Sequence, residues 1–393
     1  MEKKDYVGSD CRAFDVDSTL IKELSEGCFK PFLDFVKTHD ELELCFRKNS
    51  EPEAVTIYYN NHMVWELSYT GTPSVKISPD HARYLKDWRG TFQILEEYGY
   101  NNLSKLKIQS KKKVNKKTGE ITNSYSLKET KNNFSSCYRF SYKDVKQMYE
   151  GCMKPMMKSY FSEYERIDYF RKEERDKILE NKEVIIAKKK GQLEKIRQQE
   201  IFTANTNRET GYYIYDMEFS QPFANRSLKT EYSKTLKAEY HTNVTQNEPD
   251  MLAIRYKDGC PEALVLIEVK CTEHAMRDRN SGILKHMEGM RVYVEANINR
   301  SSLMEHRKLE AYLAMHAYRF LNVHMSTTRE IESGIQTLRS IEKLIILTDD
   351  AIEYYKDNRN IGKIQQAART TGCQIMLLHK EDRVLDVNKL ENF

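Results

Sequence analysis

The alternation of apolar and polar positions in the second half of the chain predicts a mixed β-sheet covered by helices. Five segments have the length and apolar content of strands, and three longer segments show helical periodicity. A short run of strands, followed by helices and further buried strands, is typical of a mixed sheet with helices packed on it. We expect strands at 212–219, 251–256, 263–269, 344–347 and 374–378, and helices near 281–296, 301–321 and 361–370.

The first 150 residues have a different, α+β pattern. A helical stretch at about 18–37 precedes the strand LELCFR, and two alternating segments then flank Asn60-Asn61, a sequence suited to a hairpin turn. The segment FSEYER…QQEIF is dense in Glu, Lys and Arg, contains no proline, and reads as helix. We therefore expect a mixed α/β (α+β) protein with three parts: an α+β domain at 1–150, a charged helical connector at 151–204 that includes the first helix of the following core, and a core domain at 205–393.

Composition and charge narrow the functional classes. The 393 residues include 63 Lys+Arg and 59 Asp+Glu, so a site for a polyanion must come from local clustering of charge. The chain has no apolar run near the ~20 residues that span a bilayer and no signal-peptide pattern, so we expect a cytoplasmic protein without a membrane partner. Its eight cysteines form no CxxC pair, which argues against a structural zinc site.

One cluster of positive charge lies in a second predicted hairpin, SKLKIQSKKKVNKKTGEITNSYSL, with KKTG as its turn. No acidic residue occurs between Lys105 and Lys117. A basic hairpin can contact phosphates through charge alone, and a solvated loop is the alternative interpretation. The candidate nucleic-acid-binding residues here are Lys111, Lys112, Lys113, Lys116 and Lys117.

The stretch EPDMLAIRYKDGCPEALVLIEVK (248–270) has acidic residues at both ends of another predicted hairpin. Partner positions in an antiparallel hairpin have a constant sum, so a turn centred on Gly259 places position 250 opposite position 268. Asp250 and Glu268 are then cross-strand neighbours with Cβ atoms ~5 Å apart. Lys270 shares the face of Glu268, because side chains alternate along a strand. We expect two carboxylates and an ammonium on one small patch.

Two carboxylates so close repel each other unless a cation compensates their charge. Mg²⁺, for which Mn²⁺ can substitute, prefers oxygen ligands from one or two carboxylates together with water. Such a metal polarises a phosphoryl oxygen and lowers the pKa of a bound water. A lysine beside it can orient or deprotonate the attacking water, or stabilise charge on the phosphate. The expected chemistry is phosphodiester hydrolysis, with Asp250 and Glu268 as metal ligands and Lys270 as the third catalytic residue.

P-D, seventeen intervening residues and E-V-K resemble the motif of the PD-(D/E)xK nuclease superfamily, whose core is a helix, a three-strand meander, then helix and strand. The resemblance covers roughly 190–380. It implies a restriction-endonuclease-like core at 205–393 and a Mg²⁺-dependent endonuclease, with DNA favoured over RNA as its partner. It further suggests a homodimer or higher homo-oligomer, target recognition or regulation by 1–150, and, by analogy alone, a role in restriction or another antiviral defence.

Two further carboxylates are candidates for the same patch. Members of that superfamily often add a glutamate from the preceding helix. Glu200 continues the apolar face of Leu193 and Ile196, whereas Glu194 lies to the side, so we favour Glu200. Glu218 in the first strand is the other candidate. Basic residues after the motif are expected either to line a phosphate groove or to form ordinary surface charge: His274, Arg277, Arg279, Lys285 and His286.

Two other functions stay open. A nuclease-like fold can bind nucleic acid or a protein partner without cutting, although the presence of all three motif residues argues against it. The segment FDVDSTL, with Asp15 and Asp17, resembles the DxDx(T/S) motif of haloacid-dehalogenase-type phosphatases, and LIILTDDAIE resembles the acidic motif of that family. That chemistry needs the first Asp at the end of a buried strand, and the residues before it are too polar. Residues 17–19 instead predict a helix N-cap cluster.

Overall fold

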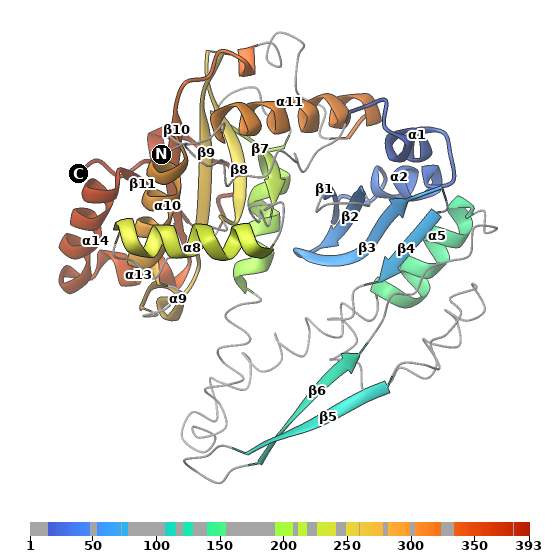
Figure 1. Ribbon diagram of the computed structural model, residues 1–393, viewed down its shortest axis with the longest axis horizontal. Coiled ribbons are helices and arrows are strands. Elements are labelled where there is room, and N and C mark those ends of the chain that lie inside the picture. Colours follow the sequence, from blue (N-terminus) through green and yellow to red (C-terminus); the bar gives the residue numbers. More distant parts are fainter. Residues whose placement is uncertain are drawn as a thin grey trace. The chain divides into compact units, whose positions relative to one another are not determined.

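The chain forms a mixed α+β structure in the computed structural model (Figure 1). It divides into two compact units, each made of more than one stretch of the chain, with boundaries at 21/22, 44/45, 53/54 and 182/183. The N-terminal unit consists of Lys22–Leu44 and Ala54–Lys182, and the C-terminal unit consists of Met1–Ile21, Cys45–Glu53 and Glu183–Phe393. The residues that the structure describes are 15–47, 53–71, 73–77, 107–114, 121–128, 140–154, 193–206, 211–217, 226–240, 249–258, 260–277, 282–298, 303–323, 334–379 and 381–393.

The first sheet has four strands in the order β1-β2-β3-β4. Asn60 and Asn61 form the predicted turn between β2 and β3, with φ angles of 50° and 54°. Asparagine tolerates this left-handed conformation, which a two-residue hairpin turn of type I′ requires at both positions. The strands are β1 (Leu42–Arg47), β2 (Ala54–Tyr59), β3 (His62–Tyr69) and β4 (Pro73–Ile77).

Aromatic side chains form the core of the N-terminal unit. The ring centroid of Phe32 lies 5.2 Å from that of Trp65 and 5.1 Å from that of Phe140, both in edge-to-face geometry. The helical stretch predicted at 18–37 is two helices. These are α1 (Thr19–Ser25) and α2 (Lys30–Val36), and α2 packs against α5 (Tyr142–Met148), which the π-helix η2 (Tyr149–Met153) continues.

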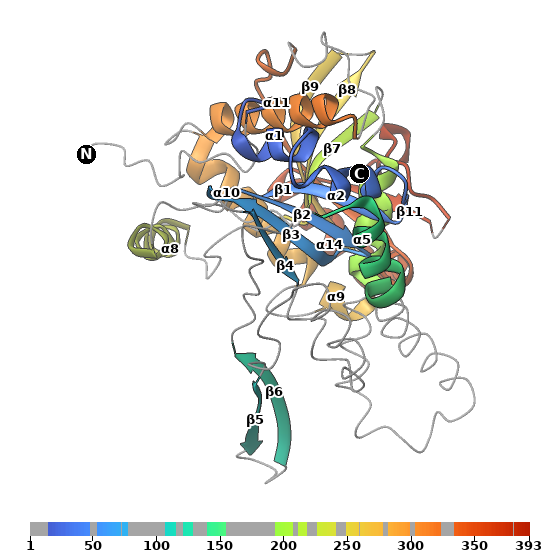
Figure 2. The same ribbon diagram turned by 90° about the vertical axis from the view of Figure 1, so that its right-hand side faces the viewer.

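The predicted basic hairpin is present as a twisted, two-stranded antiparallel ribbon (Figure 2). Its strands are β5 (Lys107–Val114) and β6 (Ile121–Lys128), in a register that runs without a bulge from Lys107↔Lys128 to Val114↔Ile121. Of the lysine candidates, Lys111, Lys112 and Lys113 lie on β5. Lys116 and Lys117 lie outside the described residues.

The second sheet, in the C-terminal unit, has five strands in the order β11-β10-β9-β8-β7. Strands β7, β8 and β9 form an antiparallel meander, whereas β9, β10 and β11 run parallel. All five strands predicted from the sequence are therefore confirmed, with shifted ends. They are β7 (Gly211–Met217), β8 (Met251–Lys257), β9 (Cys260–Lys270), β10 (Ile341–Thr348) and β11 (Cys373–Leu378).

Helices pack on this sheet as expected. The three predicted helices are α10 (Ile283–Ile298), which contacts β9 and β10, α11 (Leu303–Leu321), which contacts β7, and α14 (Asn358–Thr371), which contacts β11. A further helical segment at 193–204 precedes the meander in the chain. No helix among the described residues is long and apolar enough to span a membrane. Three helices were not predicted from the sequence: α8 (Arg226–Tyr240), α9 (Glu273–Arg277) and α13 (Asp350–Lys356).

Candidate functional site

The hairpin of β8 and β9 brings the two motif carboxylates together. Its register pairs Met251 with Ile267, and the next four pairs keep the same position sum. Asp250, which directly precedes β8, therefore lies opposite Glu268, as the sequence predicts. The two pairs nearest the turn, Tyr256↔Pro261 and Lys257↔Cys260, have a position sum one lower, so the register shift between Arg255 and Tyr256 is what brings position 250 opposite position 268.

Lys270 and His286 both contact one oxygen of Glu268. The Lys270 ammonium donates to Glu268 Oε1 over 2.6 Å, and His286 Nδ1 lies 2.7 Å from the same oxygen. Asp250 Oδ2 accepts a hydrogen bond of 2.7 Å from the backbone N–H of Val269. Glu268 and Lys270 are only 2% and 4% exposed. The three residues predicted to be catalytic thus lie together, where β8 begins and β9 ends.

A glutamate that the sequence analysis did not favour joins this cluster. Glu194 Oε1 lies 3.9 Å from Lys270 Nζ, and its carboxylate accepts a hydrogen bond from the backbone of Cys271. The Glu200 carboxylate is instead engaged by Arg197 at 2.6 Å and Arg383 at 2.9 Å. The structure therefore corrects the choice between the two glutamates: Glu194, not Glu200, faces the motif lysine.

The correction has a simple cause in the packing of the helix at 193–204. Leu193 and Ile196, which defined the predicted face, are only half-buried. The buried face that continues from Glu194 includes Gln198, Ile201, Phe202 and Asn205, at helical spacing. Two of these side chains are polar, so a search for apolar periodicity does not find this face.

The pKa values of the three carboxyl groups in the cluster are shifted in different directions by burial and by neighbouring charges. Burial, followed by the charge of Glu268, raises the pKa of Asp250 well above its ordinary value. Burial also raises the pKa of Glu194, against the opposing effect of Lys270. For Glu268, burial acts upward, but Lys270 and His286 outweigh it and lower the pKa. Of the three carboxyl groups, Glu268 therefore carries its negative charge most readily.

Burial and neighbouring charge affect the pKa of Lys270 in the opposite directions to those of a carboxyl group. Burial alone would lower its pKa, but the nearby carboxylates, Glu268 foremost and then Glu194 and Asp250, raise the pKa above its ordinary value. The side chain is therefore a charged ammonium at neutral pH. It can donate hydrogen bonds and stabilise negative charge, but it is a poor proton acceptor.

The donor set suits a hard divalent cation. Both polar contacts to Glu268 fall on Oε1, and its other oxygen, Oε2, is buried without a hydrogen-bond partner among the described residues. No three His, Cys, Asp or Glu side chains in the described part of the chain are grouped to hold a metal ion. Mg²⁺ needs fewer protein ligands, since water and substrate phosphates commonly complete its shell around one or two carboxylates. Asp250 and Glu268 fit that role.

The remaining candidates from the sequence are dispersed. His286 is in the cluster, and Lys285 precedes it on α10. His274 is exposed, and Arg277 forms an ion pair with Glu273 on α9. The three described lysines of the ribbon belong to the N-terminal unit. Glu218 and Arg279 lie outside the described residues.

The phosphatase-like motif forms the start of a helix. Asp15 Oδ1 accepts a hydrogen bond of 3.1 Å from the backbone N–H of Asp17, and Ser18 Oγ accepts one of 3.3 Å from the N–H of Ile21. The predicted N-cap is therefore confirmed. Asp349, from the acidic segment LIILTDDAIE, forms an ion pair with Arg197.

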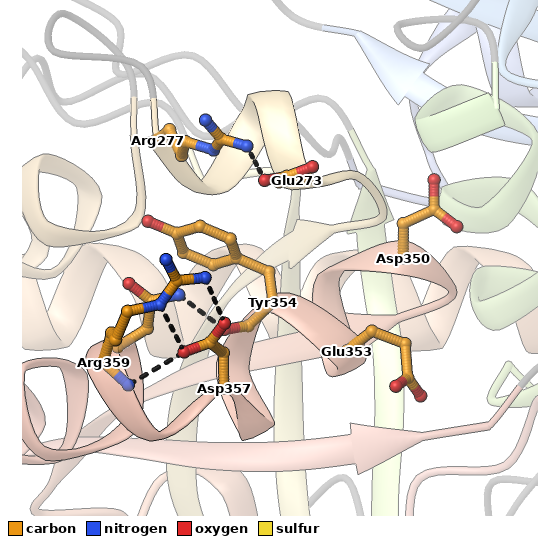
Figure 3. Close-up of a pocket in the computed structure, with 8 residues that line it drawn as sticks. Glu273, Arg277, Asp350, Glu353, Tyr354, Asp357 and Arg359 are labelled. Carbon is orange, nitrogen blue, oxygen red and sulfur yellow. Dashed lines mark hydrogen bonds and ion pairs between the residues drawn. The ribbon is translucent and has the colours of Figure 1, made fainter.

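A surface pocket of about 610 Å³ is lined by residues of α9, α13 and α14 (Figure 3). The Arg277 guanidinium lies 5.6 Å from the centroid of the Tyr354 ring, and Arg359 Nη2 donates to Asp357 Oδ2 over 2.7 Å. Both arginines are already paired with carboxylates. None of the residues of the carboxylate cluster lines this pocket. Because the arginines of the pocket are already paired, we assign the candidate chemistry to the cluster and not to the pocket. The lining residues are Glu273, Arg277, Asp350, Glu353, Tyr354, Asp357, Arg359 and Asn360.

Comparisons with known proteins find no match to this chain among family models, curated proteins or solved structures. The likeness to the PD-(D/E)xK superfamily therefore depends on the residues at 249–270 and on the order of elements around them. A function for the cluster has to be argued from its chemistry.

Proposed function

We propose that this chain is a Mg²⁺-dependent nuclease of the PD-(D/E)xK type that hydrolyses phosphodiester bonds in DNA. The observation that carries the proposal is the buried convergence of Asp250, Glu268 and Lys270, with Glu194 beside them. The element order supports it, because the helix at 193–204, the antiparallel strands β7, β8 and β9, further helices and the parallel strands β10 and β11 follow in this order, with α8 inserted between β7 and β8. This is the order expected of a restriction-endonuclease-like core.

Each residue has a separate task in this proposal. Asp250 and Glu268 hold the cation, which when bound polarises a phosphoryl oxygen and lowers the pKa of a bound water. Lys270 donates hydrogen bonds to the attacking water or to a phosphate oxygen, rather than removing a proton, because the carboxylates keep it protonated. His286 and Lys270 hold one oxygen of Glu268, which leaves the other for the cation. Glu194 adds negative charge next to Lys270.

The ribbon of β5 and β6 is the proposed site of phosphate contacts away from the cluster. Residues 107–114 and 121–128 contain lysines but no Asp or Glu, so the charged residues of these two strands are all positive. A two-stranded ribbon has dimensions that the DNA major groove accepts. The lysines and their cross-strand partners are Lys111↔Ser124, Lys112↔Asn123 and Lys113↔Thr122.

The direct test is cleavage of plasmid, single-stranded DNA and RNA in Mg²⁺, Mn²⁺ or EDTA. We expect cleavage of DNA by the parent protein only with a divalent cation. Asp250→Asn and Lys270→Met should reduce the rate about 100-fold or more. Asp382→Asn and Lys363→Met are matched controls at positions outside the cluster that should cut like the parent.

Two outcomes would contradict the proposal. Equal cleavage by the parent and both cluster variants would remove these residues from the reaction. Salt-sensitive binding of DNA without cleavage, in every metal tried, would favour a protein that binds nucleic acid without cutting it. Circular dichroism of each variant separates a chemical effect from loss of folding.

A further inference from the structure

A buried arginine ties the helix at 193–204 to the end of β10. Arg197 is 5% exposed, and its Nε and Nη2 donate to the two carboxylate oxygens of Asp349 over 2.9 Å and 3.0 Å. Its Nη1 donates to Glu200 over 2.6 Å. A bidentate pair fixes the direction of both side chains as well as their distance. Because Arg197 is buried and Asp349 is only 11% exposed, the pair holds the helix and the end of β10 in a defined relative position.

Asp349 has a backbone conformation that requires support. Its φ is 51° and its ψ is −132°, which is unfavourable for a residue with a side chain and persists only where the surroundings enforce it. It follows β10 directly, and Leu347 of β10 pairs with Lys270 of β9. Just beyond it, the backbone N–H of Ala351 donates to the carbonyl oxygen of Cys271 over 3.3 Å. The turn at Asp349 is thus connected to the residues that end β9.

The helix that carries Arg197 also carries Glu194, and the end of β9, next to the turn at Asp349, carries Lys270. Glu194 lies one helical turn before Arg197, and its carboxylate contacts Lys270 and the backbone of Cys271. The guanidinium of Arg197 donates to Asp349 and Glu200, which lie outside the cluster. The influence of the pair on the cluster therefore passes through the two elements that it joins.

We infer that the Arg197–Asp349 pair is a positioning device, which holds Glu194 against the end of β9 and so sets the affinity of the carboxylate cluster for a divalent cation. The inference rests on the proposed function. Residues behind the direct ligands of a metal commonly affect its binding in this way, through the orientation of the groups in front of them. A pair that served stability alone would leave the cation requirement of the folded protein unchanged.

The test compares Arg197→Lys and Asp349→Asn with the parent. Lysine keeps the charge but not the bidentate geometry, and asparagine keeps the size and tolerates positive φ. Arg291→Lys is the matched control, since Arg291 also contacts two carboxylates, those of Glu288 and Glu295 on its own helix α10. Three quantities are measured for each protein: Mn²⁺ affinity without substrate by calorimetry, the Mg²⁺ concentration for half-maximal cleavage, and Tm in EDTA.

We expect both variants of the pair to weaken Mn²⁺ binding by about 10-fold and to raise the Mg²⁺ requirement by a similar factor. Saturating Mg²⁺ should restore most of the parent's rate, and Arg291→Lys should match the parent. A folded variant with a lower Tm but unchanged Mn²⁺ affinity and Mg²⁺ requirement would overturn the inference. Cleavage of DNA by the parent would still support the proposed nuclease function in that case. A parent that neither binds Mn²⁺ nor cuts DNA would overturn both. If Arg197→Lys fails to fold, the same measurements on Asp349→Asn test the inference.

Discussion

Glu194 Oε1 lies 3.9 Å from the ammonium of Lys270, although the two residues come from a helix and a strand that are far apart in the sequence. Glu200, on the same helix, is held by Arg197 and Arg383 instead. The two glutamates therefore have different surroundings. One is part of the carboxylate cluster, and the other belongs to an ion-pair network at its side.

Substitution of each glutamate by glutamine separates these roles. Glu194→Gln removes negative charge beside Lys270, and we expect the cleavage rate at limiting Mg²⁺ to fall about 10-fold. Glu200→Gln should leave the rate close to that of the parent, because its carboxylate does not contact the cluster and its loss leaves both hydrogen bonds from Arg197 to Asp349 in place. Initial rates over a Mg²⁺ series measure both effects. A larger loss for Glu200→Gln than for Glu194→Gln would refute the assignment.

The position of the motif carboxylates was predictable because it depends on local structure. The turn between Lys257 and Cys260 fixes the register to within one residue, and the shift between Arg255 and Tyr256, which the sequence did not predict, brings Asp250 opposite Glu268. The five strands of the second sheet were predictable for a related reason. They are short, apolar and bounded by turn residues, and burial in a sheet requires that pattern.

The residues that helices contribute to the cluster were not predictable in the same way. Which face of the helix at 193–204 turns inward depends on what packs against it, and polar Gln198 and Asn205 are buried there. The contact of His286 with Glu268 joins two elements that no local pattern relates. Helix α8 was missed although its sequence, RSLKTEYSKTLKAEY, repeats an apolar or aromatic residue at every fourth position from Leu228 to Tyr240. Its Leu236 packs against Val292 and Ala296 of α10.

Lys270 and a divalent cation should compensate for one another in stability. Lys270→Met leaves buried carboxylates without their ammonium, and removal of one partner from a buried pair costs about 3 kcal/mol of unfolding free energy. We expect a loss of that size in EDTA. Mg²⁺ should restore part of it, because a ligand of the folded state stabilises that state.

Urea unfolding of Lys270→Met and of the parent, each in EDTA and in excess Mg²⁺, measures this compensation. Lys363→Met, at an exposed position, controls for the loss of a lysine. An equal loss of stability in both conditions would show that the cluster of the variant does not bind the cation.

The ribbon lysines should affect binding of DNA rather than its cleavage. The slope of log K against log salt concentration on duplex DNA becomes shallower by about 0.9 for each phosphate that the protein no longer neutralises. We expect the triple variant Lys111→Gln, Lys112→Gln, Lys113→Gln to show a shallower slope in EDTA and a similar rate at saturating DNA. Fluorescence anisotropy of a labelled duplex over a salt series measures the slope. Lys143→Gln and Lys146→Gln, exposed on α5 of the same unit, serve as the control.

The ion pair of Glu41 with Lys154 should make the stability of the N-terminal unit depend on pH. Burial would raise the pKa of Glu41, but the hydrogen bond and charge of Lys154 outweigh it, and the pKa lies below its ordinary value. A lowered folded-state pKa gives stability that is present above the unfolded-state pKa of about 4.3 and is lost as the pH falls through the folded-state value. Both side chains are about one-third exposed, so the contribution is at most about 1 kcal/mol.

We therefore expect Glu41→Gln to lower the free energy of unfolding at pH 7, and its difference from the parent to diminish as the pH falls below about 4.3 and through the folded-state pKa of the carboxyl group. Urea unfolding followed by tryptophan fluorescence measures the difference, since both tryptophans of the chain, Trp65 and Trp88, belong to this unit. Glu26→Gln, at an exposed position of that unit, controls for the general effect of losing a carboxylate. A difference between Glu41→Gln and the parent that persists undiminished at pH 3 would mean that Glu41 stabilises the unit through packing, not through its charge.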